Sequence, residues 1–508
     1  MNSSSKNPKP KILFWVNMFF LHFGIANQLQ KEIESDFFAI IDVPNNPKKF
    51  FQEQKIVDFQ KSWFYHDHIN LPSKKIDIDY LSNFEKKYDI NLWKIAINER
   101  LFYRFNRFYK FKTDEILSIL EQECKLFEKI LDEIKPDYFL TYDPPLHHSK
   151  LLYDLCQKKD IKVLGMYIPR IGGKCVIASN GHTMDLPSSL SNISSKNRTF
   201  EELRKYRESL NYTKNVNNYI SGRGNTISDK VKALFDYILN SDSNNIKTHY
   251  AYFGRNKSKV ILDTVNFLIK RKFRYSFIEN NLQKKINLNK KFVYFPLAVD
   301  EEFNLLHYAP FYTNQIEVIR HVAKSLPIDY TLYVKEHPAE IIRGWRKISD
   351  YKEILDIPNV HFIHPSYSSE KLYQNCSLVF TIRGTPALDA AFYQKPSITL
   401  GDVPYSLIPS IHKLNKIEEL SKLIISCINE PISSEYLDKY IELIEQNSFN
   451  FDMLGFENQR DEYFFTGGIL SDIQISISKM EEFLEQNKQT FQLISHEHIK
   501  KMNHKGSF

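Results

Sequence analysis

The sequence predicts an α/β fold: two Rossmann-like, doubly wound domains, a helical insertion in the first and a helical tail after the second. Its 508 residues exceed what one hydrophobic core usually organises. Hydrophobic residues make up 42% and charged residues 25%, the balance of a globular protein. Continuous apolar strands alternate with amphipathic helices, which is typical of a parallel sheet covered on both faces.

The first half begins with an apolar stretch, residues 12–26, that imitates a signal peptide. Asn17 and His22 interrupt it, and it is too short to span a bilayer, so we expect a buried strand that runs into a helix. Residues 45–112 look irregular and aromatic, and Thr113 is expected to cap the long helix that follows. The expected elements are a strand at 11–16, a helix at 25–33, strands at 37–43 and 138–142, helices at 113–134 and 147–158, and a strand at 161–166.

The second half shows a cleaner alternation of strands and helices. Its expected strands lie at 292–295, 330–334, 360–363, 378–382 and 397–400, and its helices at 315–325, 369–375 and 387–394. We place the first domain at 1–285, with a polar helical insertion at about 190–285, and the second domain at 286–430. Residues 431–508 form the helical tail, including a helix at 469–486, and are expected to cross back to the first domain.

Polar residues follow every strand of the second domain. Ligands of open α/β sheets bind beyond the carboxyl ends of the strands, so these residues are expected to share one rim. In chain order they are Asp300, Glu301 and Glu302; Lys335, Glu336, His337 and Pro338; His364, Ser366 and Ser368; Arg383, Gly384 and Thr385; and Gly401 and Asp402.

The turn RGTPALDA on this rim is typical of a helix start that binds an anion. Thr385 can cap the helix, Pro386 suits its first position, and Gly384 permits close backbone approach. Free N–H groups there favour a nucleotide phosphate, and Asp389 one turn on could accept hydrogen bonds from ribose. An ordinary capped helix is the alternative interpretation.

His337 ends the KEHP segment, where Pro338 fixes the backbone. Near neutral pH an imidazole can donate to a phosphate or to a leaving group. A purely structural histidine is the alternative, but the neighbouring Lys335 and Glu336 favour a functional one.

Two segments resemble the capsule polysaccharide biosynthesis family, which includes bacterial β-Kdo transferases. They are FVYFPLAVDEEF through KEHP, and LVFTIRGTPALDAAFYQKPSITLGDVPY, within residues 286–405. NLWKIAINERLF and IKPDYFLTYD extend the likeness more weakly into the first half. The resemblance implies a GT-B fold, sugar transfer in surface-glycan assembly, and a CMP-activated donor whose phosphate lies near the His-Pro histidine. Glu302 stands where the family usually has a glutamate; Asp389 and Arg383 depart from its commoner residues.

The first domain is expected to supply the reacting carboxylate, and Asp143 at the end of a strand is the leading candidate. It would act as a base in an inverting reaction, or attack the anomeric carbon in a retaining one. The alternative is a simple turn before Pro144. Glu99 and Arg100, read as helix-surface charges, and His147 are weaker acceptor-side candidates.

The expected function is therefore a glycosyltransferase that moves a sugar from a nucleotide donor, CMP-linked as the resemblance implies, to a glycan or lipid-linked acceptor. A CDP-glycerol-type glycerophosphotransferase, a sugar-nucleotide epimerase and a non-enzymatic glycan-binding export partner remain alternatives. No cofactor is expected. No metal is expected either, because the chain has no suitably placed DxD run and its five cysteines form no CxxC pair.

The charge and the aromatic content bear on location and partners. A net charge of +7 suits an anionic small molecule or a membrane surface and is too mild to indicate nucleic acid. The segment 101–112 alternates aromatic and basic residues, which fits contact with lipid or sugar, or a half-buried edge. We expect a cytoplasmic protein, with the inner face of the cytoplasmic membrane as the alternative location; the oligomeric state stays open.

Overall fold

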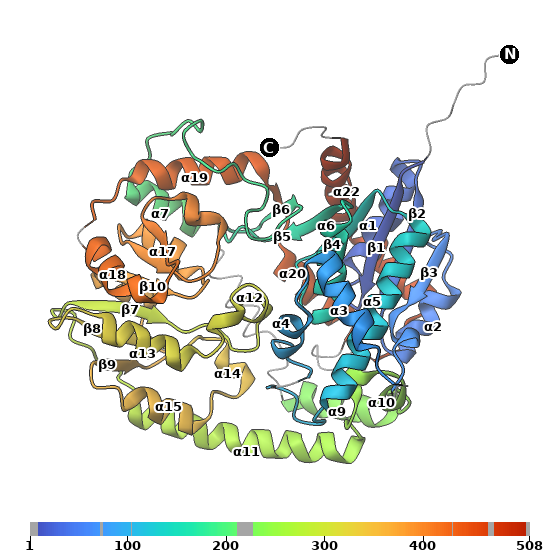
Figure 1. The fold of residues 1–508 in the computed structure, drawn as a ribbon, viewed down its shortest axis with the longest axis horizontal. Coiled ribbons are helices and arrows are strands. Elements are labelled where there is room, and N and C mark those ends of the chain that lie inside the picture. The colour runs from blue at the N-terminus through green and yellow to red at the C-terminus, as the bar shows by residue number, and fades with distance from the viewer. Residues whose placement is uncertain are drawn as a thin grey trace.

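The computed structural model describes residues 9–71, 75–102, 104–210, 227–428, 430–465 and 472–503, the side chains of 227–233 and 341–342 excepted. The chain forms two lobes, each built around one sheet (Figure 1). In both, the central strands are buried on their two faces, as the continuous apolar runs predict, whereas the edge strands β3, β12 and β13 are partly exposed. The predicted fold class, an α/β protein with two Rossmann-like domains, is confirmed.

The N-terminal lobe has a seven-stranded sheet of order β13-β6-β5-β4-β1-β2-β3. The five strands β5, β4, β1, β2 and β3 pair with their neighbours in parallel. Strand β6 pairs antiparallel with both β5 and β13. The strands are β1 (Lys11–Asn17), β2 (Asp36–Asp42), β3 (Lys61–Phe64), β4 (Tyr138–Tyr142), β5 (Lys162–Tyr167), β6 (Lys174–Ala178) and β13 (Phe449–Asn450). The helices around them are α1 (Leu21–Glu32), α2 (Asn45–Glu53), α3 (Ile78–Tyr88), α4 (Leu92–Ile97), α5 (Thr113–Ile134) and α6 (His147–Lys158), with the 3₁₀ helix η1 (Tyr65–His68).

The expectation that residues 45–112 are irregular is wrong, because this stretch contains α2, β3, η1, α3 and α4. The sequence did carry signals here: α3 buries Leu81, Phe84 and Tyr88 at helical spacing, and both α3 and α4 have ordinary caps. Asp77 accepts from the N–H of Tyr80 at 2.9 Å, and Asn91 accepts from the N–H of Lys94 at 2.7 Å. Thr113 is not a cap either: it is the first residue of α5, and Glu115 accepts from the N–H of Lys112 at 2.7 Å instead.

The C-terminal lobe has a six-stranded, fully parallel sheet of order β12-β11-β10-β7-β8-β9. Its strands are β7 (Phe292–Pro296), β8 (Thr331–Lys335), β9 (Val360–Ile363), β10 (Leu378–Thr381), β11 (Ser397–Thr399) and β12 (Ile411–Lys413). Its helices are α12 (Phe303–Leu306), α13 (Gln315–Ser325), α14 (Glu340–Arg343), α15 (Ile348–Leu355), α16 (Ser369–Asn375), α17 (Pro386–Phe392) and α18 (Leu420–Ile428), with the 3₁₀ helices η3 (Pro310–Tyr312), η4 (Pro404–Leu407) and η5 (Ile417–Glu419).

The helices of the predicted insertion attach to different lobes. α7 (Phe200–Ser209) packs on α17 of the C-terminal lobe, where Leu203 joins an apolar cluster. α10 (Asn245–Thr248) and the 3₁₀ helix η2 (Tyr250–Tyr252) attach to the N-terminal lobe, where Asn245 accepts from the N–H of Asn45 at 3.0 Å. α9 (Ile227–Asn240) lies near them, and α11 (Lys257–Asn281) runs below both lobes (Figure 1).

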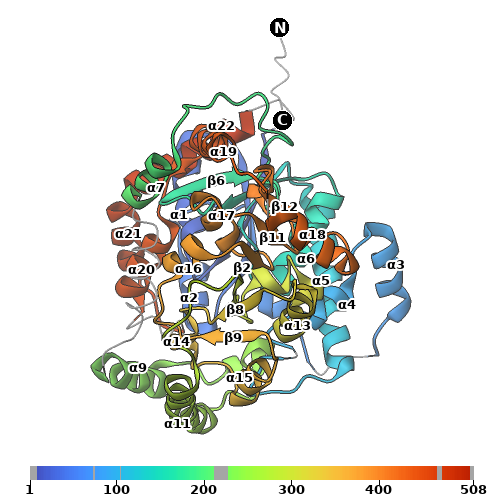
Figure 2. The ribbon, with the colours of Figure 1, turned by 90° about the vertical axis from the view of Figure 1, so that its left-hand side faces the viewer.

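The tail returns to the N-terminal lobe. α19 (Ser434–Asn447) packs on the C-terminal lobe, and β13 then joins the N-terminal sheet. α20 (Met453–Phe464), α21 (Ile477–Gln486) and α22 (Lys488–Asn503) follow, and α22 lies along α1 (Figure 2). A Cβ at Gly24 would come within 2.2 Å of the Phe491 ring, so this contact requires glycine.

The predicted helix at 469–486 is shorter than expected, because 472–476 are not helical and 469–471 lie outside the described residues. Within the described part of the chain, no helix combines the length and the hydrophobicity needed to cross a bilayer.

Candidate functional site

A cavity of about 810 Å³ lies between the lobes. Its N-terminal wall is built largely from residues at or just after strand ends, where parallel α/β sheets bind ligands. Asn17 is the last residue of β1, Asp42 the last of β2 and Tyr142 the last of β4, and Asp143 comes directly after β4. The C-terminal lobe closes the other side with Glu302, Phe303, Asn304, Arg343, Arg383, Val403, Pro404 and Tyr405.

Asp143 lies in this cavity, mostly buried, just after β4. Tyr308, from the C-terminal lobe, donates its hydroxyl to the Asp143 carboxylate, and the Arg383 guanidinium lies 4.3 Å from the Tyr308 ring. Burial raises the pKa of Asp143 to about 6, although the hydrogen bond from Tyr308 and the charge of Arg383 act in the opposite direction. Asp143 is therefore a carboxylate that titrates just below neutral pH.

A second carboxylate of the cavity, Asp42, lies between two histidines. His66 Nε2 is 3.0 Å from one oxygen of Asp42 and His148 Nε2 is 3.2 Å from the other. Burial alone would raise the pKa of Asp42, but the hydrogen bonds from His148 and His66 outweigh it and hold the pKa far below its usual range. All three residues line the cavity, and sequence reasoning missed Asp42 and His66.

Glu99 and His147 lie behind the cavity wall. The reading of Glu99 as a helix-surface charge is wrong, because it is buried and accepts from the backbone N–H and the Nδ1 of His147 at 2.6 and 2.8 Å. On its other side, His147 Nε2 lies 2.9 Å from Glu123. Burial lowers the pKa of His147, but the two carboxylates outweigh it and raise the pKa to about 10. His147 is thus a buried imidazolium between two carboxylates.

Two groups of described side chains are close enough to hold a metal ion: Glu123, His147 and His148, and His412, Cys427 and Glu430. In the first group, the contact between His147 and Glu123 has the length of a hydrogen bond. The expectation of a metal-free reaction is untested by this geometry and stays a prediction.

The C-terminal wall is held by Arg383 and its neighbours. Arg383 donates to the side chain of Asn304 and, over 2.6 Å, to the backbone oxygen of Asp402. Glu302 lies 3.9 Å from Arg343, and Arg100 of the other lobe reaches the backbone oxygen of Glu301 at 3.4 Å. Four of the predicted site residues therefore line one cavity: Asp143, Arg100, Glu302 and Arg383.

Lys335 and Glu336 lie behind this wall. Lys335 is 4% exposed, donates to Ser369 at 2.7 Å, and has its pKa lowered to about 8 by burial. Glu336 is 1% exposed and accepts from Arg346 at 2.8 Å and from Tyr351 at 3.0 Å. Both residues hold the end of β8 in place, and neither is among the residues that line the cavity.

His337 is a neutral imidazole with a defined tautomer. Burial lowers its pKa, and its Nδ1 accepts from the N–H of Ala339 at 3.1 Å. The proton of the neutral ring therefore sits on Nε2, for which the described residues supply no acceptor. His337 is only partly buried and Pro338 is exposed, but neither is among the residues that line the cavity, so the predicted contact of His337 with a donor stays a prediction.

The serines after β9 have local partners. Ser366 Oγ lies 2.7 Å from His364 Nδ1. Ser368 is the N-cap of α16 and accepts from the N–H of Lys371 at 3.3 Å. Their predicted contact with a donor is untested.

The turn at Gly384 differs from its prediction in one respect: Thr385 precedes α17 but makes no side-chain capping hydrogen bond. Its backbone is already helical at φ −47°, whereas a capping side chain needs an extended N-cap. Gly384 is tightly enclosed, since an added Cβ would lie 2.7 Å from Thr381 Oγ1. Asp389 pairs with Arg207 and accepts from Tyr373 at 3.2 Å. A ribose contact by Asp389 stays a prediction that requires the ion pair with Arg207 to open.

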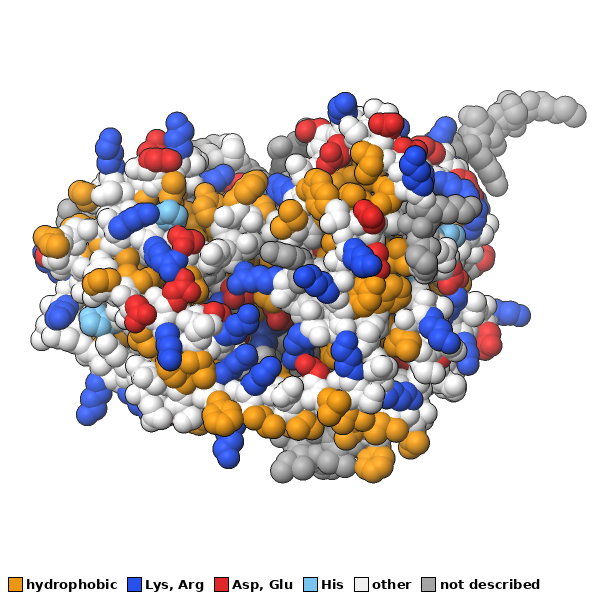
Figure 3. Space-filling view, turned by 60° about the horizontal axis from the view of Figure 1, so that its bottom comes forward, with side chains coloured by type: hydrophobic (Ala, Val, Ile, Leu, Met, Phe, Trp, Pro, Cys, Tyr) orange, Lys and Arg blue, Asp and Glu red, His pale blue; other side chains and the backbone are white. Residues whose placement is uncertain are grey.

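The cavity is rich in guanidinium groups. Figure 3 shows Lys and Arg side chains gathered around the hollow between the lobes. The lining arginines are Arg100, Arg170, Arg255, Arg343, Arg383 and Arg460, against the carboxylates Asp42, Asp143, Glu302 and Glu457. Such a set suits an anionic ligand such as a phosphate, which arginine binds through several N–H groups.

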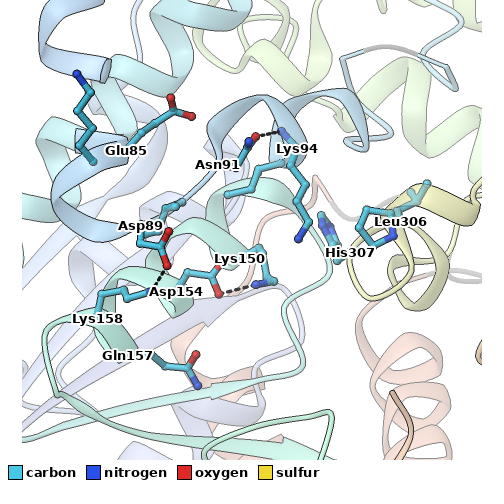
Figure 4. A pocket seen from close by; sticks show the side chains of 14 residues that line it. Glu85, Asp89, Asn91, Lys94, Lys150, Asp154, Gln157, Lys158, Leu306 and His307 are labelled. Atoms are coloured by element: carbon cyan, nitrogen blue, oxygen red, sulfur yellow. Dashed lines mark hydrogen bonds and ion pairs between the residues drawn. The ribbon is translucent and has the colours of Figure 1, made fainter. Parts of the chain in front are cut away.

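A smaller hollow of about 590 Å³ lies beside α3, α4 and α6. Figure 4 shows Lys94 pointing toward His307 of the C-terminal lobe, while Lys150 points toward Asp154. Most of its charges are already paired: Lys150 with Asp154, and Lys158 with Asp89 at 3.0 Å. The larger cavity is the better candidate site because it gathers the strand ends.

The geometry thus defines a protein with two Rossmann-like domains and an arginine-rich cavity between them. Residues 211–410 match the family model described as capsule polysaccharide biosynthesis protein. This match confirms, for that segment, the resemblance seen in the sequence. No curated protein matches the chain.

Several solved structures are weakly similar. The UDP-GlcNAc 2-epimerase of Methanocaldococcus jannaschii, in complex with UDP-GlcNAc and UDP, is 14% identical, with 86% of this chain and 99% of that chain covered and a TM-score of 0.24. KpsC of Thermosulfurimonas dismutans, a beta Kdo 2,7 transferase, is 11% identical, with 63% of this chain and 89% of that chain covered and a TM-score of 0.28. Anabaena HepE in complex with UDP-glucose is 11% identical, with 89% of this chain and 98% of that chain covered and a TM-score of 0.23. TM-scores this low support no argument about this chain.

Proposed function

We propose that this chain is a glycosyltransferase of surface-polysaccharide assembly. In this proposal it moves a sugar from a nucleotide donor, CMP-linked, to a glycan or a lipid-linked acceptor, and works in the cytoplasm at the inner face of the membrane. The family match of residues 211–410 supports the biological process. The observation that carries the reaction is the cavity between the lobes, where Asp143 and Arg383 lie together around Tyr308.

Asp143 is the reacting carboxylate of the proposal. In an inverting reaction it takes the proton from the acceptor hydroxyl, and in a retaining reaction it attacks the anomeric carbon. Both roles need the ionised form, and a pKa of about 6 leaves the carboxylate mostly ionised at neutral pH while keeping it more basic than an ordinary aspartate.

The donor is assigned to the C-terminal side of the cavity. Arg343 and Arg383 would neutralise the phosphate, which is the task a divalent ion performs in metal-dependent transferases. His337 would donate its Nε2–H to the phosphate as the nucleotide leaves, since Nδ1 is already an acceptor. Glu302 would lie beside the transferred sugar, on the same wall.

The acceptor is assigned to the N-terminal side. Nδ1 of His66 is buried and has no hydrogen-bond partner among the described residues, while its Nε2 bonds to Asp42. A buried polar atom without a partner costs free energy, which a hydroxyl of the acceptor would recover.

Nucleotide binding tests the donor assignment. A ligand that binds only the folded state stabilises it by mass action, so CMP should raise the melting temperature of the protein, compared with UDP and GDP. The His337→Ala variant should lose this shift, whereas His321→Ala, on α13, should keep it.

Other nucleotide patterns separate the alternatives. Stabilisation by UDP or GDP alone would contradict the CMP assignment, and UDP would favour an epimerase. Stabilisation by CDP alone would favour glycerophosphate transfer. A glycan-binding partner would respond to none of the nucleotides and would release no CMP from a CMP-linked sugar.

A further inference from the structure

Helix α11 exposes a stripe of apolar side chains on the underside of the molecule. Leu262 is 69% exposed, Val265 51%, Ile269 50% and Phe273 67%. Their spacings of three and four residues place them on one face of the helix. A soluble protein rarely exposes such a continuous apolar row without a partner.

The opposite face of α11 accounts for the orientation of the stripe. Arg274 donates to the backbone oxygens of Gly344 at 3.1 Å and Trp345 at 2.7 Å. Ile278 is buried in the core of the C-terminal lobe. The helix is therefore fixed to the body of the protein by one face and presents the apolar stripe outward.

Basic side chains flank the stripe. With 3.6 residues per turn, Lys270 and Lys272 fall on opposite sides of the row formed by Ile269 and Phe273, and both are exposed. α11 carries Lys257, Lys259, Lys270, Arg271, Lys272 and Arg274 against only Asp263 and Glu279. An apolar centre between basic flanks is the pattern of helices that lie in a membrane interface.

The neighbouring helix α9 extends the apolar surface. Its exposed residues are Leu234, Phe235, Ile238 and Leu239. Lys257, at the start of α11, donates to the backbone oxygen of Ile238 at 2.5 Å, and Figure 2 shows the two helices next to each other at the base of the molecule. Figure 3, with the bottom turned forward, shows hydrophobic side chains in a row along the lower edge with basic groups above it. We call these residues of α9 and α11 the underside surface.

We propose that the underside surface binds an anionic phospholipid bilayer, with its apolar residues among the acyl chains and Lys270 and Lys272 at the headgroup phosphates. Charge complementarity favours lipid over a second copy of the chain, because two copies packed through α11 would bring like charges together. The predicted lipid contact at 101–112 is not this surface: Phe102 and Phe111 are buried, and Lys259 of α11 donates to the backbone oxygen of Phe108 at 2.5 Å.

The underside surface also adjoins the cavity. Tyr252 and Arg255 line the cavity, and α11 starts at Lys257, two residues after Arg255. A bilayer bound there would hold the headgroup of a lipid-linked acceptor near the cavity; this part of the inference rests on the proposed function.

Co-sedimentation of the full chain with vesicles tests the proposal. The protein should pellet with vesicles of phosphatidylglycerol and phosphatidylcholine and stay in solution with phosphatidylcholine alone. The double variant Ile269→Glu/Phe273→Glu should stay in solution with both, whereas the control Ile328→Glu, at an exposed site of the C-terminal lobe, should pellet like wild type. Lys270→Gln and Lys272→Gln should each weaken binding about fivefold at low salt.

Two results would overturn the proposal: wild-type protein that does not pellet with anionic vesicles, or a double variant that still pellets with them. If light scattering shows a wild-type dimer that the double variant splits, without vesicle binding, the surface is an interface between copies. Stabilisation of the double variant by CMP is a separate readout, so loss of the proposed function and loss of membrane binding can be told apart.

Discussion

The cavity holds two strand-end aspartates whose surroundings push their pKa values in opposite directions. Asp143, after β4, has a pKa raised by burial to about 6. Asp42, at the end of β2, has a pKa held far below the usual range by His148 and His66, which outweigh its burial. Pairs of titratable groups with such divergent environments mark acid–base assignments in enzymes.

The two aspartates also differ in which lobe supplies their neighbouring side chains. Asp42 is held by His66 and His148 of its own lobe, so its charge is fixed in that lobe alone. Asp143 accepts from Tyr308 and lies near Arg383, both of which belong to the other lobe. The comparison teaches that the charge state of Asp143 depends on contacts between the two lobes, whereas that of Asp42 depends on one lobe alone. In the proposed mechanism Asp143 is the reacting carboxylate, and Asp42 would position the acceptor-side histidines.

Replacement of Asp143 should have the largest effect. Asp143→Asn keeps the shape but removes the base or nucleophile, so sugar transfer should fall by about 10²–10⁴-fold. Turnover of a CMP-linked donor measures this, with retained stabilisation by CMP as the control for an intact donor side. A fully active Asp143→Asn enzyme would remove Asp143 from the mechanism.

Replacement of Asp42 should act on both activity and stability. Asp42→Asn removes the carboxylate that bonds to His66 and His148, and transfer should fall by roughly tenfold as the histidines lose their orientation. A carboxylate with a lowered pKa stabilises the fold above the pH at which the unfolded chain titrates, about 3.9. The variant should therefore melt below wild type at neutral pH, and the gap should shrink as the pH falls below about 4. If both aspartate variants lost activity equally and the melting temperature of Asp42→Asn were unchanged, the proposed difference between the roles of Asp42 and Asp143 would be wrong.

Removal of the Tyr308 hydroxyl should have the smallest effect on rate but a defined effect on pH dependence. The hydrogen bond from Tyr308 lowers the pKa of Asp143, so Tyr308→Phe should raise that pKa. The acid limb of the activity profile should move to higher pH, with only a few-fold loss at its plateau. Tyr405→Phe, which removes a hydroxyl from the C-terminal wall of the cavity, is the matched control and should leave the acid limb in place. An acid limb that moves to lower pH would show that Tyr308 acts on a different group.

Much of the sheet framework could be predicted from the sequence. Apolar runs bounded by turn residues located β9 and helices α13 and α16 at the bounds of the structure. The strand-end rule placed Asp143, Glu302 and Arg383 at the cavity.

The partners of the strand-end residues could not be predicted in the same way. Glu336 and Lys335 also follow a strand, but Arg346 and Ser369 take them into the body of the lobe. Asp42 and His148 are brought together across 106 positions of the chain, which no local pattern encodes. Asp42 itself had a signal, because it ends a strand just before a proline-containing turn, as Asp143 does.

The pH dependence of kcat/KM in the wild-type enzyme tests the central claim most directly. If Asp143 is the reacting carboxylate, activity should be level near neutral pH and fall about tenfold per pH unit below a pKa close to 6. Activity that stays level down to about pH 4, the range of an unperturbed aspartate, would contradict the account and place the reacting group elsewhere.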